Sequence, residues 1–352
     1  SAWSYGTKMA VKAMYRLMGS LLSFPLAMCI VQRVSGVGWR HCTSQKKSNR
    51  SVSRDIGLTS TTCTFERGSH CARPVVKHVG KTVNIKIIDV NGQKLRVAVR
   101  PGLPGTVPLL LFNGIGAGLG LLQPFIDALD PNLEVIAFDV PGVGGSPSKA
   151  WPYRFPGLAR MVSQMLDHLN YGQVDVLGLS WGGFLAQQFA HDHPVRCRRL
   201  ILAATSAGIW SLMPHPKVLA LMATPRRYSD PEYAASIAGD IYGGKFRYDK
   251  ELAASHAVKM AADKAAMKEN GSQGYYYQVM AVYWWTSLFW LWNIKQPTLV
   301  LAGNDDPLMP LANMKVLAAC IPKSELHIFD DGHLFLLTDL PKVLPIITKF
   351  LS

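Results

Sequence analysis

Three side chains of this sequence have the types and order needed for nucleophilic catalysis, and the first of them is Ser180. It lies in the stretch VDVLGLSWGGFLAQQFA, between an apolar run that predicts a buried strand and residues that favour a helix. The pattern Gly-x-Ser-x-Gly arises easily by chance in a chain with 30 glycines, but a strand, tight turn and helix around the serine are what a nucleophile elbow requires. We predict that Gly178 and Gly182 leave room for a strained turn that presents the Ser180 hydroxyl at the sheet edge.

A base and an acid that would activate this serine follow later in the chain. A serine hydroxyl becomes an effective nucleophile when a base removes its proton and an acid holds that base in the correct tautomer. Asp306 follows the apolar run PTLVLAG in the turn NDDP, and His333 follows the run ELHIFD in the segment DDGHLF. The chain order Ser, Asp, His is that of one hydrolase architecture. We therefore predict Ser180 as nucleophile, His333 as base and Asp306 as acid.

Each assignment has a competing neighbour. Asp305 adjoins Asp306, and because consecutive loop residues point in different directions, one of the two is expected only to cap the turn. His327 lies inside a predicted strand, where a packed, hydrogen-bonded histidine is the usual finding. Asp330 and Asp331 are expected to stabilise their own loop.

The negative charge that develops on the substrate oxygen needs backbone N–H donors. One donor is expected from Trp181, which directly follows the predicted nucleophile. The second is expected from Ile115 in the segment NGIGAG, whose glycines let the backbone bend close to the substrate. A phosphate-binding loop is the alternative for this segment, but no Lys-Ser or Lys-Thr pair follows it.

Alternating strand and helix patterns must position these residues. Six apolar runs separated by four to five helical segments predict an α/β fold with a mostly parallel, twisted sheet and helices on both faces. Active sites in such folds lie beyond the carboxyl ends of the strands. Before them, the runs VNIKIID and LRVAVR flank Asn91-Gly92, a strong hairpin signal. The six runs are PLLLFN, EVIAFD, VDVLGL, RLILAA, PTLVLAG and ELHIFD.

The strand and helix alternation places an α/β core in residues 81–208 and 297–352. Residues 209–296 are longer than a single crossover needs, and we predict that they form a helical cap over the active site. At least half of the aromatics in their stretch YYYQVMAVYWWTSLFWLW are expected to form the cap's own core. A transmembrane helix over residues 275–292 is the alternative, but Gln278 and the repeated aromatics favour a cap.

Residues 1–80 differ from the rest in charge and pattern. They contain twelve Lys and Arg but only two acidic residues, so most of the formal charge of +14 belongs to them. They predict a basic, disordered leader, interpreted as a targeting sequence, a short membrane or surface anchor, or a segment without function. The remaining chain has no basic patch with interleaved aromatics, which argues against nucleic-acid binding. Cys197 and Cys320 are expected to be reduced thiols.

From residue 83 to residue 351 the sequence resembles the α/β-hydrolase family, and within it the intracellular depolymerases of medium-chain-length polyhydroxyalkanoates. The resemblance implies the α/β-hydrolase fold, a cytoplasmic protein on polyester granules, and the same three catalytic residues. One departure is Asn113, where many α/β-hydrolases have histidine. This difference in side chain does not alter the expected backbone N–H donors. The resemblance is carried by LLLFNGIGAGLGLLQPFIDALDPNLEVIAFDVPGVGGS, YGQVDVLGLSWGGFLAQQFAHDHP, ATPRRY, IYGGKF, PTLVLAGNDDPLMPL and LHIFDDGHLFL.

The activity implied by this resemblance is hydrolysis of ester bonds in a hydroxyalkanoate polyester or its oligomers, through an acyl-enzyme and without a metal ion or organic cofactor. An acyltransferase or polymer synthase is disfavoured, because those that resemble this chain have cysteine at the position of Ser180. Dehalogenases and epoxide hydrolases need a carboxylate there. A carboxylesterase or lipase for small lipophilic esters remains an alternative enzyme, and a catalytically silent granule-binding protein remains an alternative from another class.

Overall fold

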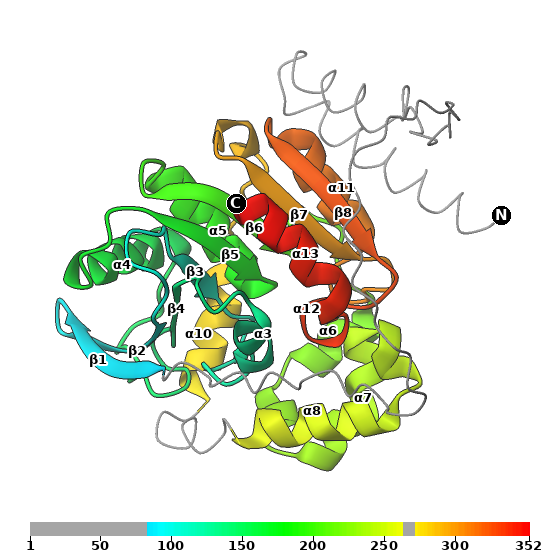
Figure 1. Ribbon diagram of the computed structural model, residues 1–352. Helices are drawn as coiled ribbons and strands as arrows, with labels where there is room; N and C mark the ends of the chain where they lie inside the picture. The colour runs from blue at the N-terminus through cyan, green and yellow to red at the C-terminus, as the bar shows by residue number, and fades with distance from the viewer. Residues whose placement is uncertain (1–82, 263–271) are drawn as a thin grey trace, which may run out of the picture.

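A sheet of eight strands forms the centre of the protein (Figure 1). The computed structural model describes residues 83–262 and 272–352, and the predicted leader lies outside the described residues. The strand order is β1-β2-β4-β3-β5-β6-β7-β8; β2 is antiparallel to β1 and β4, and the other neighbours are parallel, as predicted. The strands are β1 (Asn84–Val90), β2 (Gln93–Arg100), β3 (Leu109–Phe112), β4 (Val135–Phe138), β5 (Val174–Leu179), β6 (Cys197–Ala203), β7 (Thr298–Gly303) and β8 (Ser324–Phe329).

The first two strands form the predicted hairpin. Asn91 and Gly92 have φ values of 52° and 82°, the left-handed conformation that a tight two-residue hairpin turn requires. The Gly92 N–H donates a hydrogen bond of 2.7 Å to Asp89 Oδ1, which closes the turn. The hairpin adds an antiparallel edge to a sheet that is otherwise parallel.

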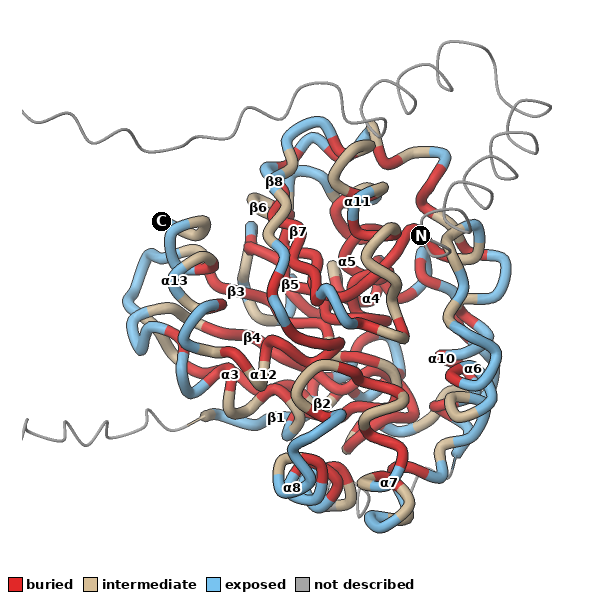
Figure 2. The backbone as a smooth tube through the Cα atoms, turned by 90° about the vertical axis from the view of Figure 1, so that its right-hand side faces the viewer, coloured by how far each residue is buried: buried red, intermediate tan, exposed pale blue. Residues whose placement is uncertain are grey.

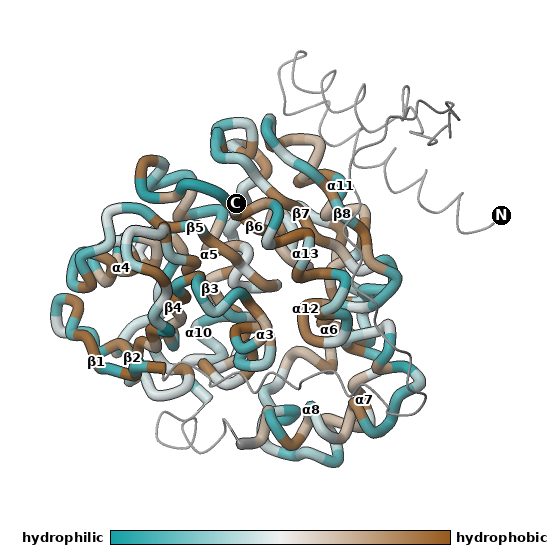
Figure 3. The backbone as a smooth tube through the Cα atoms, viewed as in Figure 1, coloured by the Kyte–Doolittle hydropathy of each residue, from teal (hydrophilic) through white to brown (hydrophobic). Residues whose placement is uncertain are grey.

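Both faces of the sheet are buried by helices. Successive side chains of a strand point to opposite faces, and in β3 Leu110 and Phe112 join one core cluster while Leu109 and Leu111 join the other. This explains why the central strands are continuous apolar runs, which stand out as buried in Figure 2 and hydrophobic in Figure 3. The first cluster includes residues of α4 (Phe155–His168), α5 (Trp181–Asp192) and α11 (Leu311–Cys320); the second includes residues of α3 (Gln123–Ala128), α12 (Phe335–Thr338) and α13 (Leu340–Leu351).

Helices occupy the interval between β6 and β7 that was predicted as a cap. In Figures 1 and 2, α7 and α8 lie together at one end of the molecule, beyond the central strands. The subdivision into core and cap domains stays a prediction. The elements of this interval are α6 (Pro216–Met222), η1 (Pro225–Tyr228), α7 (Pro231–Tyr242), η2 (Gly244–Arg247), α8 (Lys250–Ala262), α10 (Gln273–Val282) and η3 (Leu291–Asn293).

The aromatic stretch from residue 275 to residue 292 packs differently from the prediction. Tyr277 and Trp285 belong to the core cluster of the sheet, where the Trp285 ring lies 4.9 Å from Phe155 and 5.3 Å from Phe184. Tyr275 alone joins a small cluster of cap residues. The expectation that at least half of these aromatics form the cap's own core is therefore wrong, because two of the buried ones cover the sheet and four others are exposed. Across residues 83–262 and 272–352, no helix is long and apolar enough to cross a membrane.

Candidate active site

Ser180 lies at a strained turn between β5 and α5. Its φ of 55° and ψ of −116° are uncommon for a residue with a side chain. The Ser180 N–H donates to Ala203 O at 2.8 Å, and Ser180 O accepts from Thr205 Oγ1 at 2.8 Å, so the turn is tied to β6 and its following loop. A Cβ atom on Gly182 would overlap the Phe112 carbonyl, which explains why glycine is needed after the serine. The turn thus has the geometry of a nucleophile elbow.

The structure brings His333 and Asp306 together from two loops at the ends of β8 and β7. His333 Nδ1 lies 2.7 Å from Asp306 Oδ2, and both side chains are almost fully buried. The other carboxylate oxygen of Asp306 accepts hydrogen bonds from Leu308 N at 2.9 Å and Met309 N at 2.8 Å. Because a carboxylate only accepts, Nδ1 carries the imidazole proton and Nε2 is left to accept one.

The competing acidic residues have other partners. Asp305 pairs with Arg247 at 2.6 Å and accepts from Gly244 N at 2.8 Å, and these contacts lower the pKa of Asp305, the Arg247 hydrogen bond most of all. Asp331 accepts from Thr338 Oγ1 at 2.6 Å and Gly332 N at 2.7 Å. Within the described residues, neither carboxylate forms a hydrogen bond or ion pair with a histidine.

Two further candidates lie away from the His333–Asp306 pair. Asp330 accepts from Asn304 Nδ2 at 2.9 Å. His327 lies on β8 with Nε2 2.7 Å from Glu325 Oε1, as expected for a histidine within a strand.

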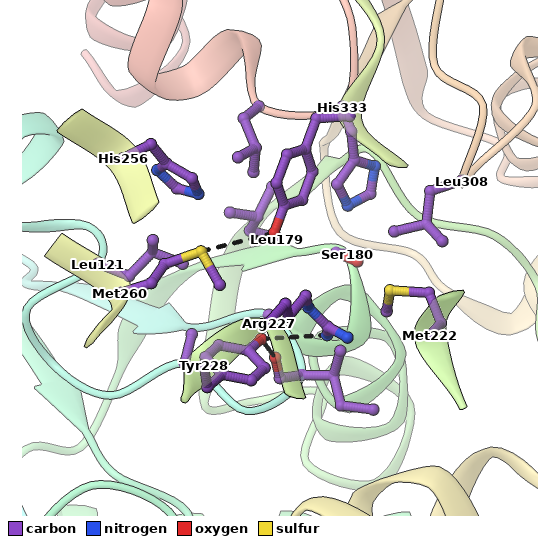
Figure 4. Close-up of a pocket in the computed structure, with 15 residues that line it drawn as sticks. Leu121, Leu179, Ser180, Met222, Arg227, Tyr228, His256, Met260, Leu308 and His333 are labelled. Atoms are coloured by element: carbon purple, nitrogen blue, oxygen red, sulfur yellow. Dashed lines mark hydrogen bonds between the residues drawn. The ribbon is translucent and has the colours of Figure 1, made fainter. Parts of the chain in front are cut away.

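Ser180 and His333 line one and the same cavity (Figure 4). Among the hydrogen bonds of the described residues, none joins the Ser180 hydroxyl to His333. Catalytic hydrogen bonds are often long before substrate binds and tighten in the complex. The wall is largely apolar, with contributions from Leu121, Met222, Met260 and Leu308.

The two predicted N–H donors lie beside Ser180. Trp181 is the first residue of α5, and the segment with Ile115 passes so close that a Cβ atom on Gly114 would be 3.8 Å from Ser180 Cβ. Within the described part of the chain, neither the Trp181 N–H nor the Ile115 N–H donates a hydrogen bond to the protein.

Gln278 of α10 links these two segments, and the sequence patterns gave no reason to select it for this task. Its Oε1 accepts from Gly116 N at 2.6 Å and its carbonyl accepts from Trp181 Nε1 at 2.9 Å. Asp139, fully buried after β4, supports the same loop by accepting from Leu119 N at 2.9 Å. For Gln278 and Asp139 alike, the sequence showed only a polar residue beside apolar ones, which did not indicate this role.

Polar side chains from the cap helices complete the cavity. They are Arg227, Tyr228, Tyr242 and His256. Burial lowers the pKa of His256 to about 4 and raises the pKa of Tyr228, so both side chains are neutral at neutral pH. The segment ATPRRY pointed to this region through the family resemblance, but its residues carried no predicted role.

Comparisons with known proteins agree with this geometry. A sequence profile described as alpha/beta hydrolase fold matches residues 107–340. Poly(3-hydroxyalkanoate) depolymerase of Ectopseudomonas oleovorans is 59% identical over 267 residues, which cover 76% of this chain and 92% of that protein. 3-Oxoadipate enol-lactonase 2 of Acinetobacter baylyi is 27% identical over 259 residues, covering 74% of this chain and 91% of that protein. The crystal structure of the enol-lactonase from Burkholderia xenovorans LB400 has a TM-score of 0.63 at 23% identity, over 76% of this chain and 99% of that chain.

The protein belongs to the α/β-hydrolase family, as the family profile and the 59% identical relative both show. The likeness to the enol-lactonase structure supports the fold alone. The predicted class of enzyme, a carboxylic ester hydrolase that resembles poly(3-hydroxyalkanoate) depolymerases, is confirmed by these similarities.

Proposed function

We propose that the protein is a serine hydrolase that cleaves ester bonds of medium-chain-length polyhydroxyalkanoate or its oligomers. The observation that carries the mechanism is that His333, held 2.7 Å from Asp306, lines the same cavity as Ser180 at the elbow. The 59% identity to a poly(3-hydroxyalkanoate) depolymerase supports the substrate class.

In this proposal Ser180 Oγ attacks the ester carbonyl while His333 Nε2 takes the hydroxyl proton. Asp306 stabilises the imidazolium that forms. The tetrahedral intermediate collapses, the C–O bond to the next unit breaks, and the His333 imidazolium gives its proton to the departing alkoxide oxygen, which leaves as a hydroxyl group. Water then attacks the acyl-enzyme in the same way and releases the carboxylic acid, so the enzyme is regenerated.

The N–H groups of Trp181 and Ile115 would stabilise the oxyanion of both tetrahedral intermediates. They are proposed for this role because they lie beside Ser180 and have no acceptor within the described part of the protein. Preorganised donors of this kind lower the barrier because they need no reorganisation when the charge develops. Gln278 would hold the two segments that carry these donors in a fixed relative position.

An exposed face of α10 supports docking on a polyester granule in the cytoplasm. The apolar stripe is defined as Tyr276, Val279, Met280, Tyr283 and Trp284, and all five side chains are exposed. The first four follow helical spacing, and α10 contains no charged residue. An insoluble polymer requires the enzyme to settle on an apolar surface before a chain reaches Ser180.

A carboxylesterase for small lipophilic esters is the second candidate, and the largely apolar wall of the cavity suits such esters. Turnover of emulsified medium-chain-length polymer and of p-nitrophenyl octanoate separates the two, because only a depolymerase releases hydroxy acids from the polymer. Activity on the octanoate with none on the polymer would leave the carboxylesterase.

Ser180→Ala tests the serine mechanism on either substrate. We expect it to lower kcat by roughly a millionfold, as for a triad that acts as a unit. Ser236→Ala removes an exposed hydroxyl of α7 and is the matched control. A loss below tenfold in Ser180→Ala would rule out the serine mechanism.

A further inference from the structure

Arg227 is a buried cation in the wall of the active-site cavity. It comes from η1, is only 3% exposed, and lines the same cavity as Ser180 and His333 (Figure 4). A charged side chain with so little contact with water is costly unless a charge or several acceptors compensate it. The surroundings of its guanidinium group therefore determine what it is for.

The partners of Arg227 are neutral phenols. Nη1 donates to Tyr275 Oη and Nη2 donates to Tyr228 Oη, both at 3.2 Å, and the guanidinium lies over the Tyr228 ring at 4.6 Å. The two hydroxyl groups donate their own protons onward, Tyr228 to the Ile115 carbonyl and Tyr275 to the Met222 carbonyl. The tyrosines orient the guanidinium without neutralising it.

No carboxylate compensates this charge. Across residues 83–262 and 272–352, no Asp or Glu forms an ion pair with Arg227, and its Nε lacks an acceptor. Two of its five N–H groups donate to Tyr275 and Tyr228, and the hydroxyl of Tyr242 is a third neutral partner of the guanidinium. The contrast is Arg100, another buried arginine, which donates to the backbone carbonyls of Ile126, Leu129, Asp130 and Leu133.

We propose that Arg227 binds the carboxylate of a hydroxyalkanoate chain end in the active-site cavity. The inference rests on the proposed function. A neutral polyester offers only ester carbonyls, whereas every cleavage of an ester bond creates a carboxylate, the acceptor that an arginine fork matches best. In a dimer the carboxylate belongs to the leaving hydroxy acid, a short chain of bonds from the scissile oxygen, and Ser180 and Arg227 likewise line one cavity, so they suit the two groups. Oligomers with a free acid end are then preferred substrates, and the released acid is a competitive inhibitor.

A pair of matched substrates tests this specificity. The substrates are the dimer of 3-hydroxyoctanoate as the free acid and the same dimer capped as an N-methylamide, which removes only the negative charge. For the wild type we expect kcat/KM to be at least tenfold higher for the free acid at pH 7.5. In Arg227→Met the ratio of kcat/KM for the free acid to kcat/KM for the amide falls at least tenfold, mainly because KM for the free acid rises. Arg227→Lys retains part of the preference for the free acid.

The ratio of kcat/KM for the free-acid dimer to kcat/KM for the amide dimer separates loss of carboxylate binding from a structural effect of the substitution. Loss of Arg227 also disturbs Tyr228 and the adjoining Ile115 carbonyl, so the variant loses kcat on both substrates, and this common loss cancels in the ratio. Arg226→Met is the matched control, because Arg226 is the neighbouring arginine, is exposed and pairs with Asp230 at 2.9 Å. It leaves the ratio unchanged.

A measurement on the wild type alone keeps the proposal testable if the variant does not fold. 3-Hydroxyoctanoate inhibits hydrolysis of p-nitrophenyl octanoate competitively, at least tenfold more strongly than 3-hydroxyoctanamide. Equal inhibition by the two compounds, or equal kcat/KM for the two dimers, overturns the role of Arg227 and leaves the proposed function intact. A wild-type enzyme that cleaves the emulsified polymer but neither dimer overturns this inference alone, and one that cleaves neither the polymer nor the dimers overturns the proposed function and this inference with it.

Discussion

Asp305 and Asp306 are adjacent and chemically identical, yet their neighbours give them different tasks. Asp306 faces inward to His333 and is held by two backbone N–H groups. Asp305 faces outward, where it joins Arg247 and Gly244 of the cap segment to the loop after β7. The first contact fixes the orientation of the His333 ring, and the second ties the cap segment to the loop after β7.

This difference predicts the ranking of two isosteric variants. Asp306→Asn removes the acceptor that fixes the His333 tautomer, so we expect kcat on p-nitrophenyl octanoate to fall by roughly 10⁴-fold at neutral pH. Asp305→Asn weakens an exposed ion pair, and we expect less than a tenfold change. Circular dichroism of both variants controls for folding. The opposite ranking of the two losses would show that the acid of the triad is misassigned.

At the scale of elements, α10 connects the active site with the molecular surface. Gln278 on its buried side holds the segments that carry the Ile115 and Trp181 N–H groups. The apolar stripe begins on its exposed side and continues past its end through Tyr283 to Trp284, which is 77% exposed. If the proposed function holds, a helix with these two faces would bring a polymer surface close to Ser180.

If the apolar stripe docks on polymer, substitutions in it should lower activity on polymer more than activity on a soluble substrate. In the double variant Tyr283→Ser, Trp284→Ser, we expect the ratio of polymer turnover to p-nitrophenyl octanoate turnover to fall about tenfold, together with granule binding in a sedimentation assay. A tenfold loss corresponds to about 1.4 kcal/mol. Partial burial of the two rings against a polymer accounts for it, since full burial of one such ring contributes roughly 2 kcal/mol.

Tyr248→Ser is the control for this variant, because Tyr248 is also highly exposed but lies after η2 and outside the stripe. We expect it to leave the ratio unchanged. An unchanged ratio in the double variant, with or without loss of overall activity, would argue against docking through α10 and favour the carboxylesterase.

At the scale of the whole molecule, the central sheet was predictable because its strands are buried on both faces and read as apolar runs. The carboxyl ends of parallel strands meet at one edge, so Ser180, Asp306 and His333 could be grouped from their places after three runs. The positions of Arg227 and Gln278 could not be predicted this way. Both lie on helices between β6 and β7, and helical periodicity indicates a buried face but not the element that this face contacts.

His256 illustrates the same limit, since its burial depends on long-range packing. It comes from α8, lies 5.4 Å from the Tyr242 ring and 5.3 Å from the Phe246 ring, and has no acceptor or donor at Nε2 within the described residues. Desolvation lowers its pKa from 6.5 to about 4 in the folded protein. A histidine at helical spacing in the sequence carries no sign of this.

The shift of the His256 pKa predicts how global stability changes with pH. Between about pH 6.5 and pH 4 the unfolded chain binds a proton at this residue and the folded protein does not, so the free energy of unfolding falls as the pH falls. From pH 7.5 to pH 5 this group accounts for about 2 kcal/mol of lost stability. In His256→Phe, whose ring packs against the same aromatics, urea unfolding should show a loss smaller by about that amount. His168→Gln, at an exposed histidine, is the control and should show the same pH dependence of stability as the wild type. An unchanged pH dependence in His256→Phe would mean that His256 is protonated in the folded protein as readily as in the unfolded chain.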